Sequence, residues 1–261
     1  MTEARASVVS SFTIIKGSLI DETYEAFAAW DFSQSKLENL QRLERDHAFG
    51  ALSRNWSRDV RKVLNRRYDP EGRDRPIVEL AQRGCERALW HPLLLWHMTR
   101  DEFLVRDFLV NWLHAQYEAG AYRLETADVA AYLETLAAKP DIEWSGEWSA
   151  TTRDRVATGL LRIAADFGLL TQGAVKEFAS YHLPDDSFLY LLHALSAEEG
   201  NARRLIDAED WRMYLMAAED VEREILRLHQ FNRLGYEVAG SLARLDLPAD
   251  SPAAYARELV A

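Results

Sequence analysis

Apolar residues recur at intervals of three and four along most of the chain, which is the spacing of one face of an α-helix. One such segment, between residues 102 and 112, places on one face Phe103, Leu104, Val105, Phe108, Leu109 and Trp112. Another repeats the spacing with Val156, Leu160, Ile163, Ala164 and Phe167. Ala, Leu, Arg and Glu, all good helix formers, are abundant. The pattern predicts an all-α, compact multi-helix globular protein.

Strand signals are few, and polar breaks divide the helical segments. Residues 8–15 and 175–183 are the two strand candidates, and the second suits one arm of a short wing-like hairpin. A polar loop with Pro and Gly at residues 69–76 marks the first boundary. We therefore expect an N-terminal helical domain over residues 1–72 and a C-terminal helical domain over residues 73–261, with a helix-turn-helix-like segment near 126–183.

Composition narrows the class of protein. The chain has 261 residues, 48% of them hydrophobic, and a net charge of −11, which argues against a disordered protein. Its single cysteine, Cys85, excludes a disulfide framework and a zinc site of several thiolates, which fits a reducing cytoplasm. The most apolar stretch, residues 88–98, is far shorter than the roughly 20 residues of a membrane span. No signal peptide is visible, so we expect a cytoplasmic protein that makes no membrane contact.

Residues 53–67 are strongly basic in this acidic chain, with six basic residues against Asp59 alone: Arg54, Arg58, Arg61, Lys62, Arg66 and Arg67. At about 100° per residue, the first five share one helix face, opposite Trp56, Val60, Val63 and Leu64. Ser53 suits the N-cap. The apolar spacing in residues 35–49 predicts an amphipathic helix before the basic one. A turn between the two helices can form at residues 50–53. This is the outline of a helix-turn-helix with an outward basic helix.

A row of guanidinium groups suits phosphate oxygens, because arginine meets a phosphate with two parallel hydrogen bonds. A basic helix face is also commonly a solvated surface, or is paired with acids elsewhere, and 42 acidic residues are available here. The preference for arginine over lysine also has a simple source in GC-rich coding. Spacing alone therefore leaves both interpretations open.

A second candidate helix covers residues 149–170, with Thr151 or Thr152 able to cap its start and Gly168 near its C-cap. Its outward face carries Arg155, Thr158 and Arg162. The helix and the extended segment after it are reminiscent of the recognition helix of a winged helix-turn-helix. Asp154 and Asp166 dilute its charge, so an ordinary packing helix is the competing interpretation.

Catalytic motifs are missing from the sequence. There is no dinucleotide-binding glycine pattern, P-loop, HExxH or nucleophile elbow. His91 and His97 lie among Trp and Leu and are expected in the core, and Cys85 is expected to be an inert small residue. A hydrolase using the scattered carboxylates of Asp185, Asp186, Glu198 and Glu199 is the weakest alternative. We expect no metal, no cofactor and no enzymatic activity.

Several segments, taken in order, resemble the BrxA family of bacteriophage-exclusion (BREX) defence systems. They are residues 11–23 (SFTIIKGSLIDET), the basic residues 53–67, residues 93–98 with 103–109, and residues 152–170 ending in Gly-Leu-Leu. The likeness covers roughly residues 8–195. It implies an all-helical monomer with helix-turn-helix elements that binds double-stranded DNA. It also implies that the protein acts together with a methyltransferase, a phosphatase-like protein and large ATPases to restrict phage.

Two functions therefore compete. In the first, the chain is a non-enzymatic accessory protein whose basic residues 54–67 hold the DNA backbone, with a second contact from residues 155–162. In the second, it is an adaptor that joins subunits of the same defence complex without touching DNA. The part played by residues 196–261 is not indicated.

Overall fold

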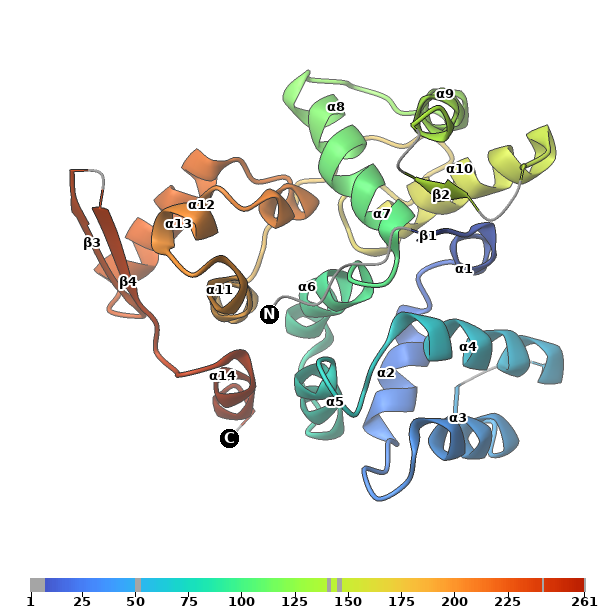
Figure 1. The fold of residues 1–261 in the computed structure, drawn as a ribbon, viewed down its shortest axis with the longest axis horizontal. Coiled ribbons are helices and arrows are strands. Elements are labelled where there is room, and N and C mark those ends of the chain that lie inside the picture. The colour runs from blue at the N-terminus through green and yellow to red at the C-terminus, as the bar shows by residue number, and fades with distance from the viewer. Residues whose placement is uncertain (1–7, 50–52, 140–141, 145–146, 241, 261) are drawn as a thin grey trace.

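The computed structural model describes residues 8–49, 53–139, 142–144, 147–240 and 242–260. It is mostly helical, with one two-stranded antiparallel hairpin near the C-terminus (Figure 1). The expected fold class is therefore confirmed. Within the described residues, no helix combines the length and the apolar character that crossing a membrane requires.

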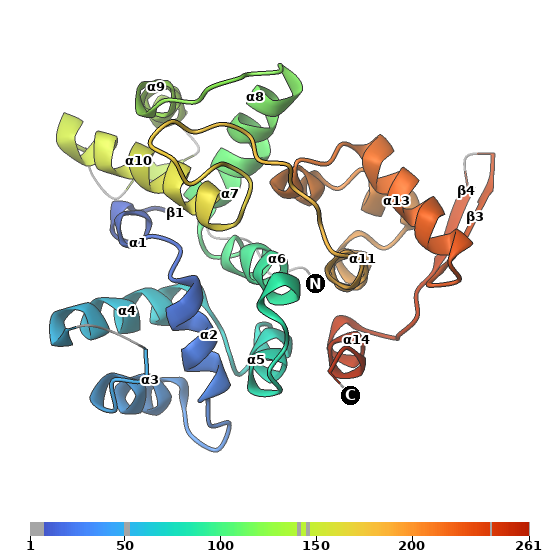
Figure 2. The ribbon, with the colours of Figure 1, turned by 180° about the vertical axis from the view of Figure 1, so that it is seen from behind.

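The N-terminal region is a group of short helices that begins with a two-residue strand. Its elements are β1 (Val8–Val9), α1 (Ser11–Lys16), α2 (Ile20–Ala28), α3 (Lys36–Arg45) and α4 (Arg54–Arg67). Ser35 caps α3 in a capping box with Glu38, and the Ser53 hydroxyl accepts a hydrogen bond from the Trp56 amide at the start of α4. The two helices pack side by side (Figures 1 and 2). The expected turn at residues 50–53 falls largely on residues 50–52, outside the described part of the chain.

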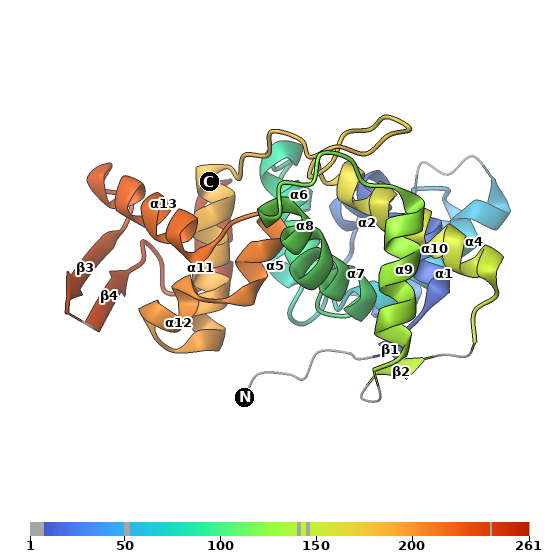
Figure 3. The same cartoon turned by 90° about the horizontal axis from the view of Figure 1, so that it is seen from above.

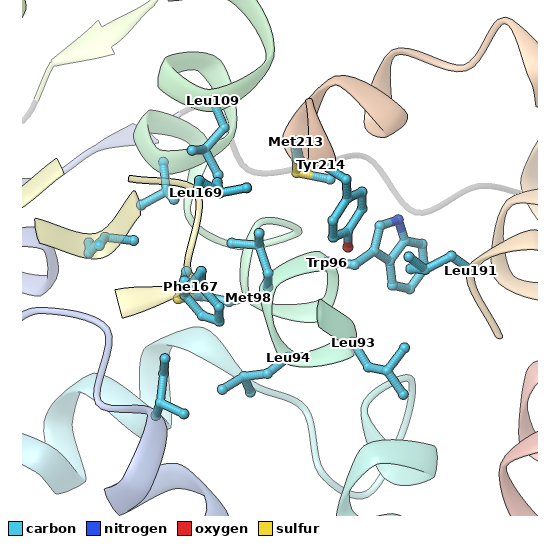
Figure 4. Packing of buried hydrophobic residues seen from close by; sticks show 14 of the residues in the cluster. Leu93, Leu94, Trp96, Met98, Leu109, Phe167, Leu169, Leu191, Met213 and Tyr214 are labelled. Carbon is cyan, nitrogen blue, oxygen red and sulfur yellow. The ribbon is translucent and has the colours of Figure 1, made fainter. Parts of the chain in front are cut away.

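The middle of the chain forms the centre of the molecule and one of its ends. Its elements are α5 (Arg75–Gln82), α6 (Arg87–Met98), α7 (Phe103–Asp107), the π-helical segment η1 (Phe108–Leu113), α8 (His114–Glu118), α9 (Thr126–Ala137), β2 (Glu143–Trp144) and α10 (Ala150–Asp166). Helix α6 is nearly all apolar. Its side chains lie among those of Phe167 and Leu169, which follow α10, and of Leu191, Met213 and Tyr214 from the C-terminal region (Figure 4). A helix that is apolar on every side has to be buried, which explains its central position.

The C-terminal region lies at the opposite end from α4 and α10 (Figures 1 and 3). Its elements are α11 (Asp185–Glu199), α12 (Ala202–Ile206), the 3-10 segment η2 (Glu209–Tyr214), α13 (Ala218–Gln230), β3 (Gly235–Ala239), β4 (Leu242–Asp246) and α14 (Pro252–Glu258). Helix α14 returns to pack on both α5 and α11. Through α5, this helix contacts the N-terminal half of the chain.

The strand predictions need correction. Within residues 8–15 only β1 is a strand, and α1 begins at Ser11, because that helix buries Thr13 and Ile14 against its neighbours. Burial outweighs the strand preference of this β-branched run. Residues 175–183 hold no continuous strand and form only isolated bridges at Lys176 and Phe178. The antiparallel hairpin is β3–β4, where no strand was expected. The division into two domains at residue 72 stays a prediction.

Candidate nucleic-acid interface

Helix α4 presents a row of cations at four-residue steps. Arg54, Arg58, Lys62 and Arg66, here called the α4 ladder, are all exposed. Val60, Val63 and Leu64 on the other side are fully buried. At 1.5 Å per residue, the ladder extends over about 18 Å of the helix. The expected division of α4 into an apolar back and a basic front is present.

The acids near the ladder are paired with other cations. Asp59 forms an ion pair with Lys16 of α1 (2.5 Å), and Glu44 of α3 forms one with Arg61 (2.6 Å). Arg61 is half-buried in that pair and is therefore less available than expected. Among the described residues, no acid forms an ion pair with any member of the α4 ladder. The ladder thus keeps its positive charge facing solvent.

Arg67 was wrongly placed in the phosphate-binding set. Its side chain is fully buried. Its Nε donates to Glu102 Oε1, and its Nη1 and Nη2 donate to the carbonyls of Ser18 and Thr13, each at 2.9 Å. Thr13 Oγ1 also donates to Glu102, at 2.9 Å. Arg67 therefore joins α1, α4 and the start of α7, and a ligand outside the protein cannot reach it.

A hollow of about 510 Å³ lies between α3 and the start of α4. Its lining includes two members of the ladder, Arg54 and Arg58, with Arg45 at the end of α3 and His47 just after it; its one acid, Glu44, is paired with Arg61. Arg45 was missed in the sequence because it ends a helix of mixed charge. In the structure it extends the basic surface beyond α4.

Helix α10 carries a second outward face of the expected composition. Thr151, Arg155, Thr158 and Arg162 are exposed along one side, while Val156, Leu160 and Ile163 are buried. The Ser149 hydroxyl caps the helix by accepting from the Thr152 amide, so the cap lies two or three residues earlier than expected.

Short extended segments flank α9 and α10 and pair with one another. The Leu124 amide donates to the Lys176 carbonyl (2.9 Å) and the Thr171 amide to the Glu177 carbonyl (2.9 Å). The Ala179 amide donates to the Leu169 carbonyl (3.0 Å). Residues 176–179 thus lie between the other two segments, and residues 172–175 form the turn that connects them to the segment after α10. These pairings form isolated bridges and not continuous strands. The helix-turn-helix-like character of residues 126–183 stays a prediction.

Helix α1 connects the two basic surfaces. It packs against both α4 and α10, and the three helices lie at the same end of the molecule (Figures 1 and 2). Its contact with α10 is close: a Cβ at Gly159 would lie 2.9 Å from the Ile14 carbonyl oxygen. Only glycine allows this approach without displacing α1.

His97, His91 and Cys85 are wholly or partly buried. His97 is buried, with Nδ1 2.7 Å from Asp74 Oδ1 and Nε2 2.8 Å from the Tyr190 hydroxyl. His91 is half-buried. Cys85 is buried, which raises the pKa of its thiol to about 11. Within the described part of the chain, no group of three or more His, Cys, Asp or Glu side chains is arranged to hold a metal ion.

Comparison with known proteins identifies the family. No curated protein matches the chain. A family model for BrxA matches residues 11–194, which run from the first residue of α1 into α11 and include both basic surfaces. This match covers more than half of the sequence. The chain therefore belongs to the BrxA family, and this membership implies that it is a component of a BREX phage-defence system.

Proposed function

We propose that the chain is a non-enzymatic protein that binds double-stranded DNA through the α4 ladder within its BREX system. The observation that carries the proposal is a row of four exposed cations, free of ion pairs with described acids, on a protein whose net charge is −11. The BrxA family is generally considered non-catalytic. The acidic remainder repels nucleic acid, which confines contact to the basic end.

The α4 ladder is long enough to face several phosphates of duplex DNA. A duplex carries one phosphate charge per roughly 1.7 Å of its axis, so the length of the ladder faces about ten phosphates. Four cations can each meet one of them. Arg155 and Arg162 of α10 add a second contact at the same end of the molecule.

The number of contacts sets the expected salt dependence. Each neutralised phosphate contributes about −0.9 to the slope of log K against log salt concentration. Four ladder contacts therefore give a slope of about −4, before any contribution from α10. Contacts to phosphate alone carry little sequence preference.

The test is a fluorescence anisotropy titration with a mixed-sequence duplex at several salt concentrations. The variant Arg58→Glu/Arg66→Glu reverses two ladder charges. Its matched control is Arg223→Glu/Arg244→Glu, which makes the same charge change on side chains 73% and 72% exposed at the opposite end. We expect salt-sensitive binding by the wild type and the control, and at least a tenfold loss in the ladder variant. Equal binding by both variants would show that the ladder is not the interface.

The alternative is an adaptor function in the same defence complex, with the basic ladder and the acidic remainder of the chain meeting different protein partners. The contrast between the exposed α4 ladder and the net charge of −11 of the whole chain favours it. If the wild type fails to bind a duplex even at low salt, the adaptor function takes precedence. Retention of a defence subunit by the wild type, and its loss in one of the two charge-reversal variants, would then support it.

A further inference from the structure

A hollow of about 650 Å³ lies beside α10. Three separate segments line it: residues 123–127, one side of α10, and residues 172–176. The backbone pairing of Leu124 with Lys176 brings the first and third of these segments together. The hollow is therefore a product of the fold and is invisible in the sequence.

The lining of this hollow is cationic. It contains Arg123, Arg162 and Lys176 against one acid, Glu125. Arg123 is exposed and forms no ion pair with a described residue. Arg162 is 70% exposed and lies 3.9 Å from Asp166, a distance at which the guanidinium remains open to another anion.

Two further features add to the attraction for an anion. Lys176 Nζ donates to the Thr171 carbonyl (3.1 Å), which positions the ammonium group without neutralising it. The first residues of α9, Thr126 and Ala127, also line the hollow, and α9 is a helix of twelve residues. The unpaired amides of a helix N-terminus carry a partial positive charge. The cationic side chains and the amides at the start of α9 therefore attract an anion to the same hollow.

We propose that this hollow holds a phosphate group of a DNA strand and thereby sets α10 into the major groove. The inference rests on the proposed DNA-binding function. Arg123, Arg162 and Lys176 would hold the backbone, and Arg155 and Thr158 on the exposed face of α10 would contact base edges. The major groove is wide enough to admit one α-helix. The α4 ladder then supplies affinity without sequence preference, and α10 supplies the preference.

This division separates two measurable quantities. Loss of a phosphate contact weakens binding to all sequences alike and makes the salt slope less steep, by about 0.9 for each contact. Loss of a base contact changes which sequence is preferred. Arg155→Lys keeps the positive charge but loses the two-pronged donor that recognises guanine, and Thr158→Val removes only a hydroxyl.

The experiment uses the full chain and two readouts. Selection from a randomised duplex pool gives the sequence preference, and anisotropy titrations over a series of salt concentrations give the slope. The phosphate variant is Arg123→Gln/Lys176→Gln. Its control is Arg153→Gln, which removes a cation from α10 that pairs with Glu134 of α9. Circular dichroism verifies that each variant is folded.

We expect the phosphate variant to lower affinity for all duplexes and to flatten the slope by about 2, with the preferred sequence unchanged. Arg155→Lys and Thr158→Val should reduce the preference for the selected sequence roughly tenfold at an unchanged slope. If the ladder variant loses binding while Arg123→Gln/Lys176→Gln matches the Arg153→Gln control, the hollow is not a phosphate site. If the selection yields no preferred sequence, α10 does not read bases. If the wild type binds no duplex, the proposed function itself is wrong.

Discussion

Arg66 and Arg67 are adjacent in the sequence and have opposite structural roles, which permits a sharp test of the structure. The change is Arg67→Met, which keeps a similar apolar stem and removes the guanidinium. It deletes three hydrogen bonds and leaves the Glu102 carboxylate, only 3% exposed, with the hydrogen bond that the Thr13 hydroxyl donates to it. The matched control is Arg66→Met, one residue away and exposed to solvent.

The magnitude follows from burial. Removing one partner of a buried ion pair costs about 3–5 kcal/mol, because the other charge stays buried without compensation. Against a total stability of about 5–15 kcal/mol, this is a large fraction. An exposed substitution away from packing changes stability by about 0.5 kcal/mol or less. Urea unfolding followed by circular dichroism measures both, with an unchanged m value as the sign of an intact two-state transition.

A second variant separates loss of the pair from poor packing. In Arg67→Met/Glu102→Leu both charges are absent, and apolar replacement of a buried pair is often close to neutral. We expect the double variant to recover most of the lost stability. DNA affinity should show the reverse order: reduced in Arg66→Met and unchanged in the folded double variant. A loss below 1 kcal/mol for Arg67→Met, or equal DNA affinities for both single variants, would refute the assignment.

Three further predictions concern the core. Gly159→Ala should destabilise the protein by about 1–3 kcal/mol in thermal or urea unfolding, because its Cβ would lie 2.9 Å from the Ile14 carbonyl oxygen. A stabilised variant would show that α1 can move away from α10. Burial lowers the pKa of His193 to about 4, so the unfolded state binds the additional proton as the pH falls below about 6.5. Stability should therefore fall between pH 6.5 and pH 4, by up to about 3 kcal/mol, and a smaller dependence is expected in His193→Phe; identical pH profiles would contradict this. The Cys85 thiol, buried and with its pKa raised to about 11, should react with iodoacetamide only on unfolding, and rapid labelling of the native protein would count against its burial.

Sequence periodicity was sufficient to predict which face of α4 is buried, because local and tertiary preferences agree in this helix. Spacing at 100° per residue separates the α4 ladder from Val60, Val63 and Leu64, and the structure keeps that separation. The same spacing contains the signal that corrects Arg67, which lies seven residues after Val60 and four after Val63, on the apolar face. The number of positive charges in the segment does not show that Arg67 lies on the buried face.

Other features required contacts between distant residues. The hollow beside α10 needs Arg123, Arg162 and Lys176 in one place, and the pairing of Leu124 with Lys176 brings two of them together. Residues 8–15 have the β-branched composition of a strand, yet most of them are helical because α1 is packed between α4 and α10. A local pattern carries no information about such partners.

The sequence by itself determined the helical class, the Ser53 cap and the side of α4 that faces water, because each depends on residues within a few turns of one helix. Only the tertiary structure decided which cations are available to a ligand. Arg67 is buried because Glu102 lies 35 residues further along the chain and pairs with it, and Arg61 is held by Glu44 of a neighbouring helix. The availability of a charge depends on its nearest opposite charge, and the fold sets that distance.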